Sequence, residues 1–290
     1  MIKQAIYVPN FGAWGSPGLL VDLALDAEKA GFDGLFLWDH INISSKEGVE
    51  TVDPSVALGA IAQVTSRIKI GPVVTPIARR RPWKLARELV TLDVLSDGRL
   101  IFGAGLGEPP ELEFSAFGEN SSGKVRAGKL DEGLVVLDRL TRGQETNFRG
   151  EHYQIQDVQF RPVSIQNPRF PIWIAATLPG MAGVSRSLGW DGIFPVVRPD
   201  TSMVGENFKW SHWFPTLVDF KKVVDTVKKR RTADTSFDFI ASGLLGEKDC
   251  KGSSIDDYAK AGATWWLHWI DDSFDSYSET VRKIKAGPVA

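Results

Sequence analysis

The feature that most constrains the fold is a regular alternation of short apolar runs with longer amphipathic segments along all 290 residues. The runs are nearly continuous in apolar residues, which is typical of strands covered on both faces. The segments between them carry apolar residues at helical spacing. The expected strands cover residues 3–8, 33–38, 67–75, 99–104, 171–175, 191–196, 236–242 and 264–270. The expected helices cover residues 19–30, 54–65, 82–95, 125–141, 179–188, 213–229, 255–261 and 276–286.

Strands that are separated by helices cannot pair as hairpins and need crossover connections, which make neighbouring strands parallel. Eight such units in a chain of this length favour a closed barrel over an open sheet. An open dinucleotide-binding sheet would place Gly-x-Gly-x-x-Gly after the first strand, and residues 9–15 do not fit that pattern. We therefore predict an α/β fold, a single (β/α)8 TIM-barrel domain over residues 1–290. A small β-hairpin insertion is expected after the fourth helix, between Thr146 and Pro162.

Charge and cysteine content exclude several classes of partner. The formal net charge is −2, so there is no overall field to attract nucleic acid or an anionic membrane. The single cysteine, Cys250, is typical of a reducing compartment. No signal peptide or membrane span is expected, and the four histidines show no metal-ligand spacing. We predict a cytoplasmic protein without a metal site, acting on a small-molecule substrate.

Catalytic groups of a barrel lie at the carboxyl ends of its strands, where Asp39 and His40 directly follow the second strand. His40 is suited to exchange a proton near neutral pH, and Asp39 could act beside it as a hydrogen-bonding or acid/base partner. The alternative is a helix-capping aspartate next to a histidine whose hydrogen bonds are satisfied. The position at the end of a strand favours the functional interpretation.

Glu108 follows the glycine-rich segment 103–107 at the end of the fourth strand. Glycines there would let a flat ligand approach the backbone closely. Glu108 is a candidate proton donor, or alternatively a solvated loop carboxylate beside Pro109.

Two further segments are candidate anion sites. Arg79, Arg80 and Arg81 precede a helix and could hold a phosphate or carboxylate, with the contacting arginine left open. Residues 175–180 join the fifth strand to its helix, and their free amides could bind an anion. Simple capping of that helix by Thr177 is the alternative.

The eighth strand contains three of the ten tryptophans. Alternation places Trp266 and His268 on one face and Trp265, Leu267 and Trp269 on the other. One of the two sets must face the barrel interior.

These segments resemble the bacterial luciferase-like family of flavin-dependent oxidoreductases, over essentially the whole chain. The residues that carry the resemblance are 37–40, 70–76, 81–88, 96–100 with 103–107, 171–176 and 189–192. The family combines these motifs, and none of them would identify it alone.

The resemblance implies a barrel that binds FMN or the deazaflavin coenzyme F420 at the carboxyl ends of its strands. It also implies a non-proline cis peptide near Val73 and Val74. The match of Asp39, His40 and Glu108 to the substrate side of deazaflavin-dependent members favours F420. The cofactor-binding residues that it implies are Asp39, Val73, Val74, Thr75, Gly105, Gly107, Ala176, Thr177, Leu178 and Gly180. Members often carry Gly-Gly where this chain has Thr177 and Leu178, a departure at the phosphate contacts.

The leading hypothesis is hydride transfer between reduced FMN or F420 and a small organic substrate, with oxygen insertion possible for FMN and with His40, Glu108 and Asp39 as catalytic residues. A glycoside hydrolase using Asp39 and Glu108, and a flavin-binding protein without turnover, are the alternatives. A homodimer is expected from the resemblance.

Overall fold

The computed structural model describes residues 2–44, 48–198, 210–246, 249–270 and 276–289. The chain divides into two compact units. The first comprises residues 1–8, 25–35 and 172–290, and the second comprises residues 9–24 and 36–171. The helix α1 (Pro17–Ala30) and the strand β2 (Gly34–Leu37) each contribute residues to both units.

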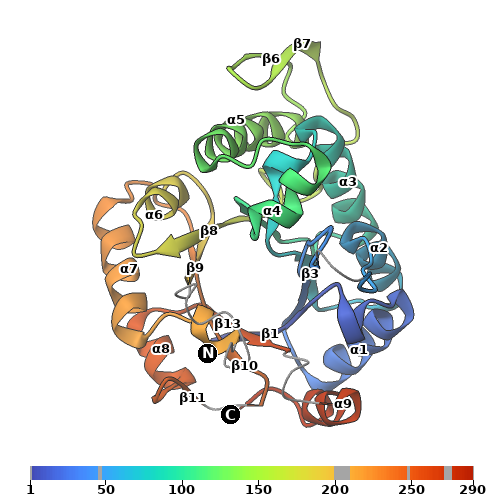
Figure 1. The fold of residues 1–290 in the computed structure, drawn as a ribbon, viewed down its shortest axis with the longest axis vertical. Helices are drawn as coiled ribbons and strands as arrows, with labels where there is room; N and C mark the ends of the chain where they lie inside the picture. Colours follow the sequence, from blue (N-terminus) through green and yellow to red (C-terminus); the bar gives the residue numbers. More distant parts are fainter. Residues whose placement is uncertain (1, 45–47, 199–209, 247–248, 271–275, 290) are drawn as a thin grey trace. The chain divides into compact units, whose positions relative to one another are not determined.

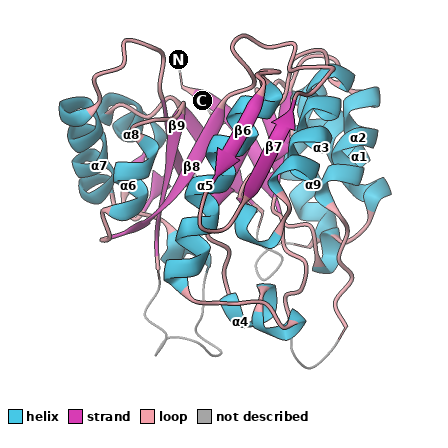
Figure 2. Ribbon diagram, turned by 90° about the horizontal axis from the view of Figure 1, so that it is seen from above, coloured by secondary structure: helices cyan, strands magenta, loops and turns pink. Residues whose placement is uncertain are grey.

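The first unit is built on parallel strands in the order β1, β13, β10, β9, β8. These strands are β1 (Lys3–Val8), β8 (Ile172–Leu178), β9 (Gly192–Val197), β10 (Asp238–Leu244) and β13 (Trp265–Trp269). Its helices are α6 (Ala182–Ser187), α7 (Leu217–Arg230), α8 (Ile255–Ala261) and α9 (Tyr277–Lys285). Figure 2 shows α6, α7 and α8 grouped beside β8 and β9. A short antiparallel pair, β11 (Asp249–Cys250) with β12 (Ser253–Ser254), precedes α8.

The second unit contains the strands β3 (Lys69–Pro72), β4 (Thr75–Pro76) and β5 (Phe102–Gly105) and the helices α2 (Pro54–Val64), α3 (Pro82–Leu95), α4 (Pro110–Glu113) and α5 (Gly123–Thr141). The strand β4 pairs parallel with β5, and α2 packs beside α3 (Figure 1). The antiparallel hairpin of β6 (Thr146–Arg149) and β7 (Gln154–Val158) follows α5. Short 3-10 turns lie at Gly12–Trp14, Ile77–Arg79 (η2), Ser115–Phe117 and, in the first unit, Trp210–Trp213 (η5).

Local sequence signals explain several element boundaries. Asp53 caps α2 by accepting a hydrogen bond from the Val56 amide, and Pro54 occupies the first turn. Ser254 and Asp257 form a reciprocal capping box at the start of α8. Gly98 has φ of +74° after α3, a conformation that favours glycine. The bounds of β1, α3 and α8 coincide with those predicted from the sequence, whereas the expected strand 67–75 is divided by bends at residues 73–74.

The alternation along β13 is resolved by its contacts. Trp265 packs edge-on against Trp173 of β8, with ring centroids 5.4 Å apart, although β10 and β9 lie between their strands in the sheet order. Trp265, Leu267 and Trp269 therefore face the inner side of this sheet. Trp266 and His268 face the other side, where Trp266 packs against Tyr258 of α8.

His268 is fully buried, and its Nε2 lies 2.8 Å from the Gln4 side-chain oxygen. Burial lowers the pKa of His268 to about 4. No helix in the described residues is long and apolar enough to cross a bilayer.

The lowered pKa of His268 predicts a loss of stability in mild acid. Between pH 6.5 and about 4 the unfolded chain binds a proton that the folded chain excludes, so the free energy of unfolding falls as pH falls. His268→Gln can still hydrogen bond to Gln4 but does not titrate. In urea unfolding between pH 6.5 and 5, we expect the free energy of unfolding of the variant to fall less steeply than that of the wild type. The difference between the two slopes should be about 1.4 kcal/mol per pH unit. Equal slopes for the two proteins would contradict this role.

Candidate active site

The candidate site lies in the second unit, at the carboxyl ends of β2 and β4, and its centre is the Asp39 carboxylate. Asp39 is 4% exposed. Its Oδ1 accepts a hydrogen bond of 2.5 Å from Arg79 Nη2, and Arg80 Nη2 lies 2.9 Å from both carboxylate oxygens. The Thr75 hydroxyl donates to Oδ2 at 2.8 Å. Both oxygens of Asp39 are thus occupied by donors from the chain itself.

The position of this cluster follows from strand order. Asp39 comes two residues after β2, Thr75 begins β4, and Arg79 and Arg80 lie at the end of η2. Burial lowers the pKa of Arg79, and the neighbouring Asp39 opposes this. At Arg80 the effect of burial is outweighed by Asp39, so its pKa lies above the ordinary value. The Asp39 carboxylate thus favours the charged form of both guanidinium groups.

His40 is held at its ring and at its backbone. Its Nδ1 lies 2.9 Å from Oε1 of Glu113, whose side chain is fully buried. Asn10 accepts from the His40 amide and donates to the His40 carbonyl. Phe11 and Trp38 pack against the imidazole, with centroids 5.5 and 5.8 Å away. Burial lowers the pKa of His40 to about 4, with Asp39 raising it and Arg79 lowering it further. His40 is therefore neutral near pH 7.

Glu113 is the site residue that the sequence reasoning missed. It is the last residue of α4, a single turn opened by Pro110, between the strand predicted over 99–104 and the helix predicted over 125–141. Besides His40, its carboxylate contacts Nη1 of Arg79 and accepts from the Ile41 amide. In the sequence, a Pro-Pro pair indicates the start of a helical turn that carries acidic residues. Tertiary packing, which the sequence does not reveal, directs the Glu113 side chain toward His40. Glu108, the predicted donor, is half-exposed in the same connection.

The glycines after β5 have packing roles. A side chain at Gly103 would bring its Cβ within 3.0 Å of the Val73 backbone. Gly107 has φ of +84° and lies against Pro76 and Phe114. The carbonyls of Leu106 and Gly107 accept hydrogen bonds from buried Arg126, at 3.1 and 2.5 Å. Gly103 and Gly107 therefore make room for the chain itself, and a close approach of a ligand to these glycines stays a prediction.

The backbone around β3 and β4 agrees with the family resemblance. The peptide bond between Val73 and Val74 is cis, as the resemblance implied. Val74 is half-buried, whereas the residues on either side of it, Val73 and Thr75, are buried. Leu106 and Gly107 after β5, and His40 after β2, are also half-buried. The ends of these strands thus present partly accessible surface, as a ligand would require.

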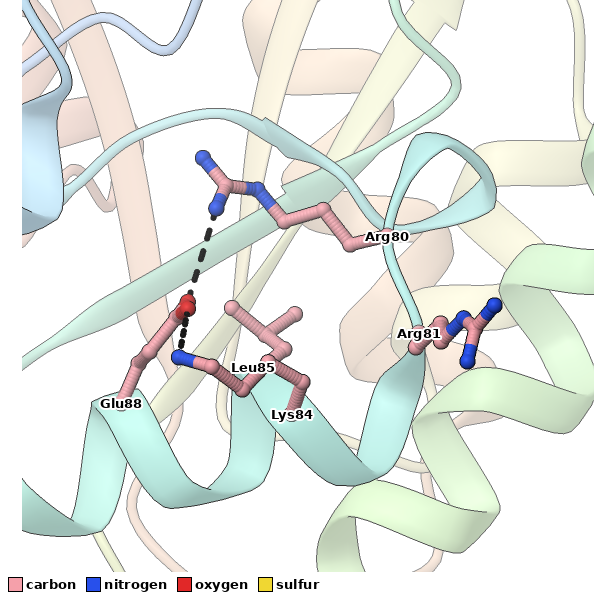
Figure 3. Close-up of a pocket in the computed structure, with 5 residues that line it drawn as sticks. All are labelled: Arg80, Arg81, Lys84, Leu85 and Glu88. Carbon is pink, nitrogen blue, oxygen red and sulfur yellow. Dashed lines mark hydrogen bonds and ion pairs between the residues drawn. The ribbon is translucent and has the colours of Figure 1, made fainter.

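The three predicted anion-binding arginines have different surroundings. Arg79 and Arg80 are engaged with Asp39, and Arg80 also lies 3.5 Å from Glu88. Figure 3 shows a pocket at the start of α3 where Arg80 and Lys84 both reach Glu88, while the Arg81 side chain points away from that carboxylate. Arg81 is the exposed member of the three and forms no ion pair with any residue that the structure describes. It remains the arginine open to an outside anion.

Residues 175–180 lie in the first unit and differ from the prediction. Ala176, Thr177 and Leu178 belong to β8 and pair with residues 195–197 of β9, so they are not a free loop. The residue before α6 is Met181, which corrects the suggestion that Thr177 caps this helix. Only Pro179, Gly180 and Met181 connect β8 to α6, because the parallel ladder continues further than its apolar run indicated. In the described part of the chain, no cluster of histidine, cysteine and acidic residues could hold a metal.

Comparison with known proteins identifies the family. The family model described as luciferase-like monooxygenase matches residues 8–203. The chain is 30% identical over 243 residues to the F420-dependent glucose-6-phosphate dehydrogenase of Nakamurella multipartita, covering 76% of this chain and 68% of that one. It is 33% identical over 169 residues to the enzyme of the same name from Amycolatopsis mediterranei, covering 57% and 50%. The chain spans about half the length of several such curated relatives. It belongs to the luciferase-like monooxygenase family.

Solved structures show the same fold. The coenzyme F420-dependent tetrahydromethanopterin reductase of Methanopyrus kandleri aligns with a TM-score of 0.74 at 17% identity, covering 98% of this chain and 96% of that one. An F420-dependent secondary alcohol dehydrogenase solved with an F420-acetone adduct aligns with a TM-score of 0.71 at 16% identity, covering 97% of each chain. The predicted luciferase-like barrel is confirmed.

Asp39 should be essential to the stability of this unit. Asp39→Asn keeps the shape of the side chain but leaves two largely buried arginines with one carboxylate fewer, so we expect the free energy of unfolding to drop by about 3–5 kcal/mol. Asp225→Asn is the matched control, because its ion pair with Lys221 is exposed and should contribute less than about 1 kcal/mol. Urea unfolding at pH 7 measures both, and equal small losses would contradict the proposed cluster.

Gly103→Ala should destabilise the protein by about 1–3 kcal/mol, because the new methyl group meets the Val73 backbone rather than a flexible side chain. Gly59→Ala is the control: Gly59 lies within α2, and its Cβ would meet only Leu95 at 4.0 Å. Alanine there should stabilise by up to about 1 kcal/mol. Thermal unfolding followed by circular dichroism compares the two variants, and a stable Gly103→Ala protein would show that this contact is not tight.

Proposed function

We propose that this protein is an oxidoreductase that exchanges a hydride between coenzyme F420 and a small organic substrate carrying an oxidisable alcohol. The observation that carries the proposal is the His40 imidazole at the carboxyl end of β2. It is neutral, its Nδ1 is held by a hydrogen bond, and the Asp39 charge lies close enough to raise its pKa. The F420-dependent relatives and the family match support the choice of chemistry. F420 is favoured over FMN because the curated relatives at 28–33% identity carry F420 in their names.

A flat cofactor ring would lie at the ends of β2 to β5. Val74, Leu106 and Gly107 are half-buried there, so apolar side-chain and backbone surface is partly accessible at these strand ends. We propose that Val74 and Gly107 contact the ring, and that the buried Asp39, Val73, Thr75 and Gly105 support this surface from behind. Ala176, Thr177, Leu178 and Gly180 stay candidates for the phosphate-bearing tail, with Thr177 and Gly180 exposed at the end of β8.

When bound, F420 supplies the hydride acceptor or donor. The residues of the chain manage the proton that accompanies it. As the carbon–hydrogen bond of an alcohol breaks and the hydride leaves, the carbon–oxygen double bond forms and the hydroxyl proton passes to Nε2 of His40. Asp39 is engaged with Arg79 and Arg80 and acts as a positioning residue. Glu108, half-exposed after β5, is the candidate for proton exchange at the cofactor.

A second candidate is oxygen insertion with FMN, which the description of the family model favours. Glycoside hydrolysis is disfavoured, because both Asp39 oxygens are occupied by Arg79, Arg80 and Thr75 and the group is 4% exposed. A homodimer and a cytoplasmic location stay predictions. Glucose 6-phosphate is the first substrate to test, since it is the substrate in the names of the relatives.

Titration of the purified protein with F420 and with FMN tests the proposal. We expect F420 fluorescence to change with a micromolar Kd and FMN to bind more weakly. In turnover with F420 and an accepted alcohol, His40→Asn should lower kcat by about 10²–10⁴-fold while F420 still binds. Binding of neither cofactor would reject the proposal, and tighter binding of FMN would favour the oxygenase alternative.

A further inference from the structure

We propose that Glu113 is a positioning residue that fixes His40 with its proton on Nδ1 and so presents Nε2 as the proton acceptor. This deepens the proposed function, and its catalytic part rests on that function. The tautomer itself can be measured independently of any activity.

The contacts of Glu113 require it to be ionised. Its side chain is fully buried, and its Oε2 is paired with Nη1 of Arg79, which has donors only. The Ile41 amide donates to Oε1 at 3.3 Å. Every neighbour whose hydrogen-bonding role is fixed is therefore a donor. An ionised carboxylate accepts hydrogen bonds and cannot donate them.

The tautomer of His40 follows. Its Nδ1 lies 2.9 Å from Oε1 of Glu113, so Nδ1 must carry the hydrogen. A neutral imidazole carries one hydrogen, which leaves Nε2 as an acceptor. Among the residues that the structure describes, Nε2 has no hydrogen-bond partner, and the His40 side chain is 19% exposed. The nitrogen without a partner is thus the basic one, on a side chain that is partly accessible.

The orientation of the His40 ring is held by its neighbours. Asn10 binds the His40 amide and carbonyl together. Phe11 and Trp38 contact the imidazole at interplanar angles of 82° and 50°. A ring turned by 180° would place the Cδ2 carbon where Nδ1 now lies, so the buried Glu113 carboxylate would lose this hydrogen-bond donor.

Glu113 also stabilises the charged form of His40. Arg79 contacts both Asp39 and Glu113, and Arg80 contacts Asp39, so two cations meet two carboxylates. A proton that arrives on Nε2 makes His40 cationic beside an ionised Glu113. The carboxylate therefore stabilises the charged histidine formed during the reaction, while Arg79 prevents Glu113 from taking the proton itself.

The next residue in the chain holds Glu113 in place. Phe114 is fully buried, lies against Gly107 and stacks 5.4 Å from the Arg126 guanidinium. Arg126 in turn binds the carbonyls of Leu106 and Gly107. The glycine-rich connection after β5 is thereby tied to the carboxylate that orients His40.

Nitrogen-15 NMR of protein labelled at histidine tests the inference in the intact chain. The sequence has four histidines, and His40→Asn identifies the pair of ring signals that belongs to His40. At pH 7 we expect a protonated Nδ1 and an unprotonated Nε2. A protonated Nε2 in the wild-type protein would overturn the proposal.

Glu113→Gln should reverse the tautomer. Arg79 can only donate, so the glutamine oxygen turns toward Arg79 and its amide group toward Nδ1, which must then accept. Glu88→Gln is the matched control, because Glu88 binds Arg80 and Lys84 and should leave the His40 signals unchanged. A folded Glu113→Gln protein that keeps the wild-type tautomer would contradict the proposed role.

In turnover with F420 and an alcohol that the wild type oxidises, Glu113→Gln should lower kcat by on the order of 10²–10⁴-fold with little change in KM. An unchanged kcat would overturn the catalytic part. A wild type that binds neither cofactor would reject the proposed function and leave the tautomer result standing, so the two failures are distinguishable.

Discussion

The site depends on the sharing of Arg79 between two buried carboxylates. Asp39 and Glu113 lie on segments far apart in sequence, and Arg79 binds both. Removing charges from water costs several kcal/mol for each ion, which only close pairing and additional hydrogen bonds offset. Thr75 and the Ile41 amide supply such bonds to the two carboxylates. The cluster is therefore better understood as a device that fixes geometry around His40 than as a source of net stability.

The sequence predicted the part of this site that strand order determines. Asp39 and His40 follow an apolar run that could only be a buried strand, and a parallel barrel collects such ends at one face. It could not predict Glu113, because α4 is a single turn without a helical period. Which acidic residue of a short turn reaches His40 is decided by the burial of Phe114, a tertiary contact.

The same distinction explains the fold. The bounds of α3 and α8 follow from local chemistry: Pro82 in the first turn of one helix and the Ser254 cap of the other. The connection at residues 175–180 was misplaced, because the parallel ladder with β9 extends to Leu178, beyond the apolar run. Thr177 is exposed within that strand, and no local signal separates an exposed strand residue from a helix cap.

Two carboxylates near one histidine are typical of paired acid/base chemistry. Here, however, the surroundings of both carboxylates make them positioning groups. Asp39 is occupied by two arginines, and Glu113 is occupied by Arg79 and the His40 ring. Neither has an open oxygen for a substrate proton. The site therefore offers one proton acceptor, the Nε2 atom of His40. A reaction that moves one proton together with a hydride needs a single acceptor of this kind, whereas glycoside hydrolysis needs two accessible carboxyl groups.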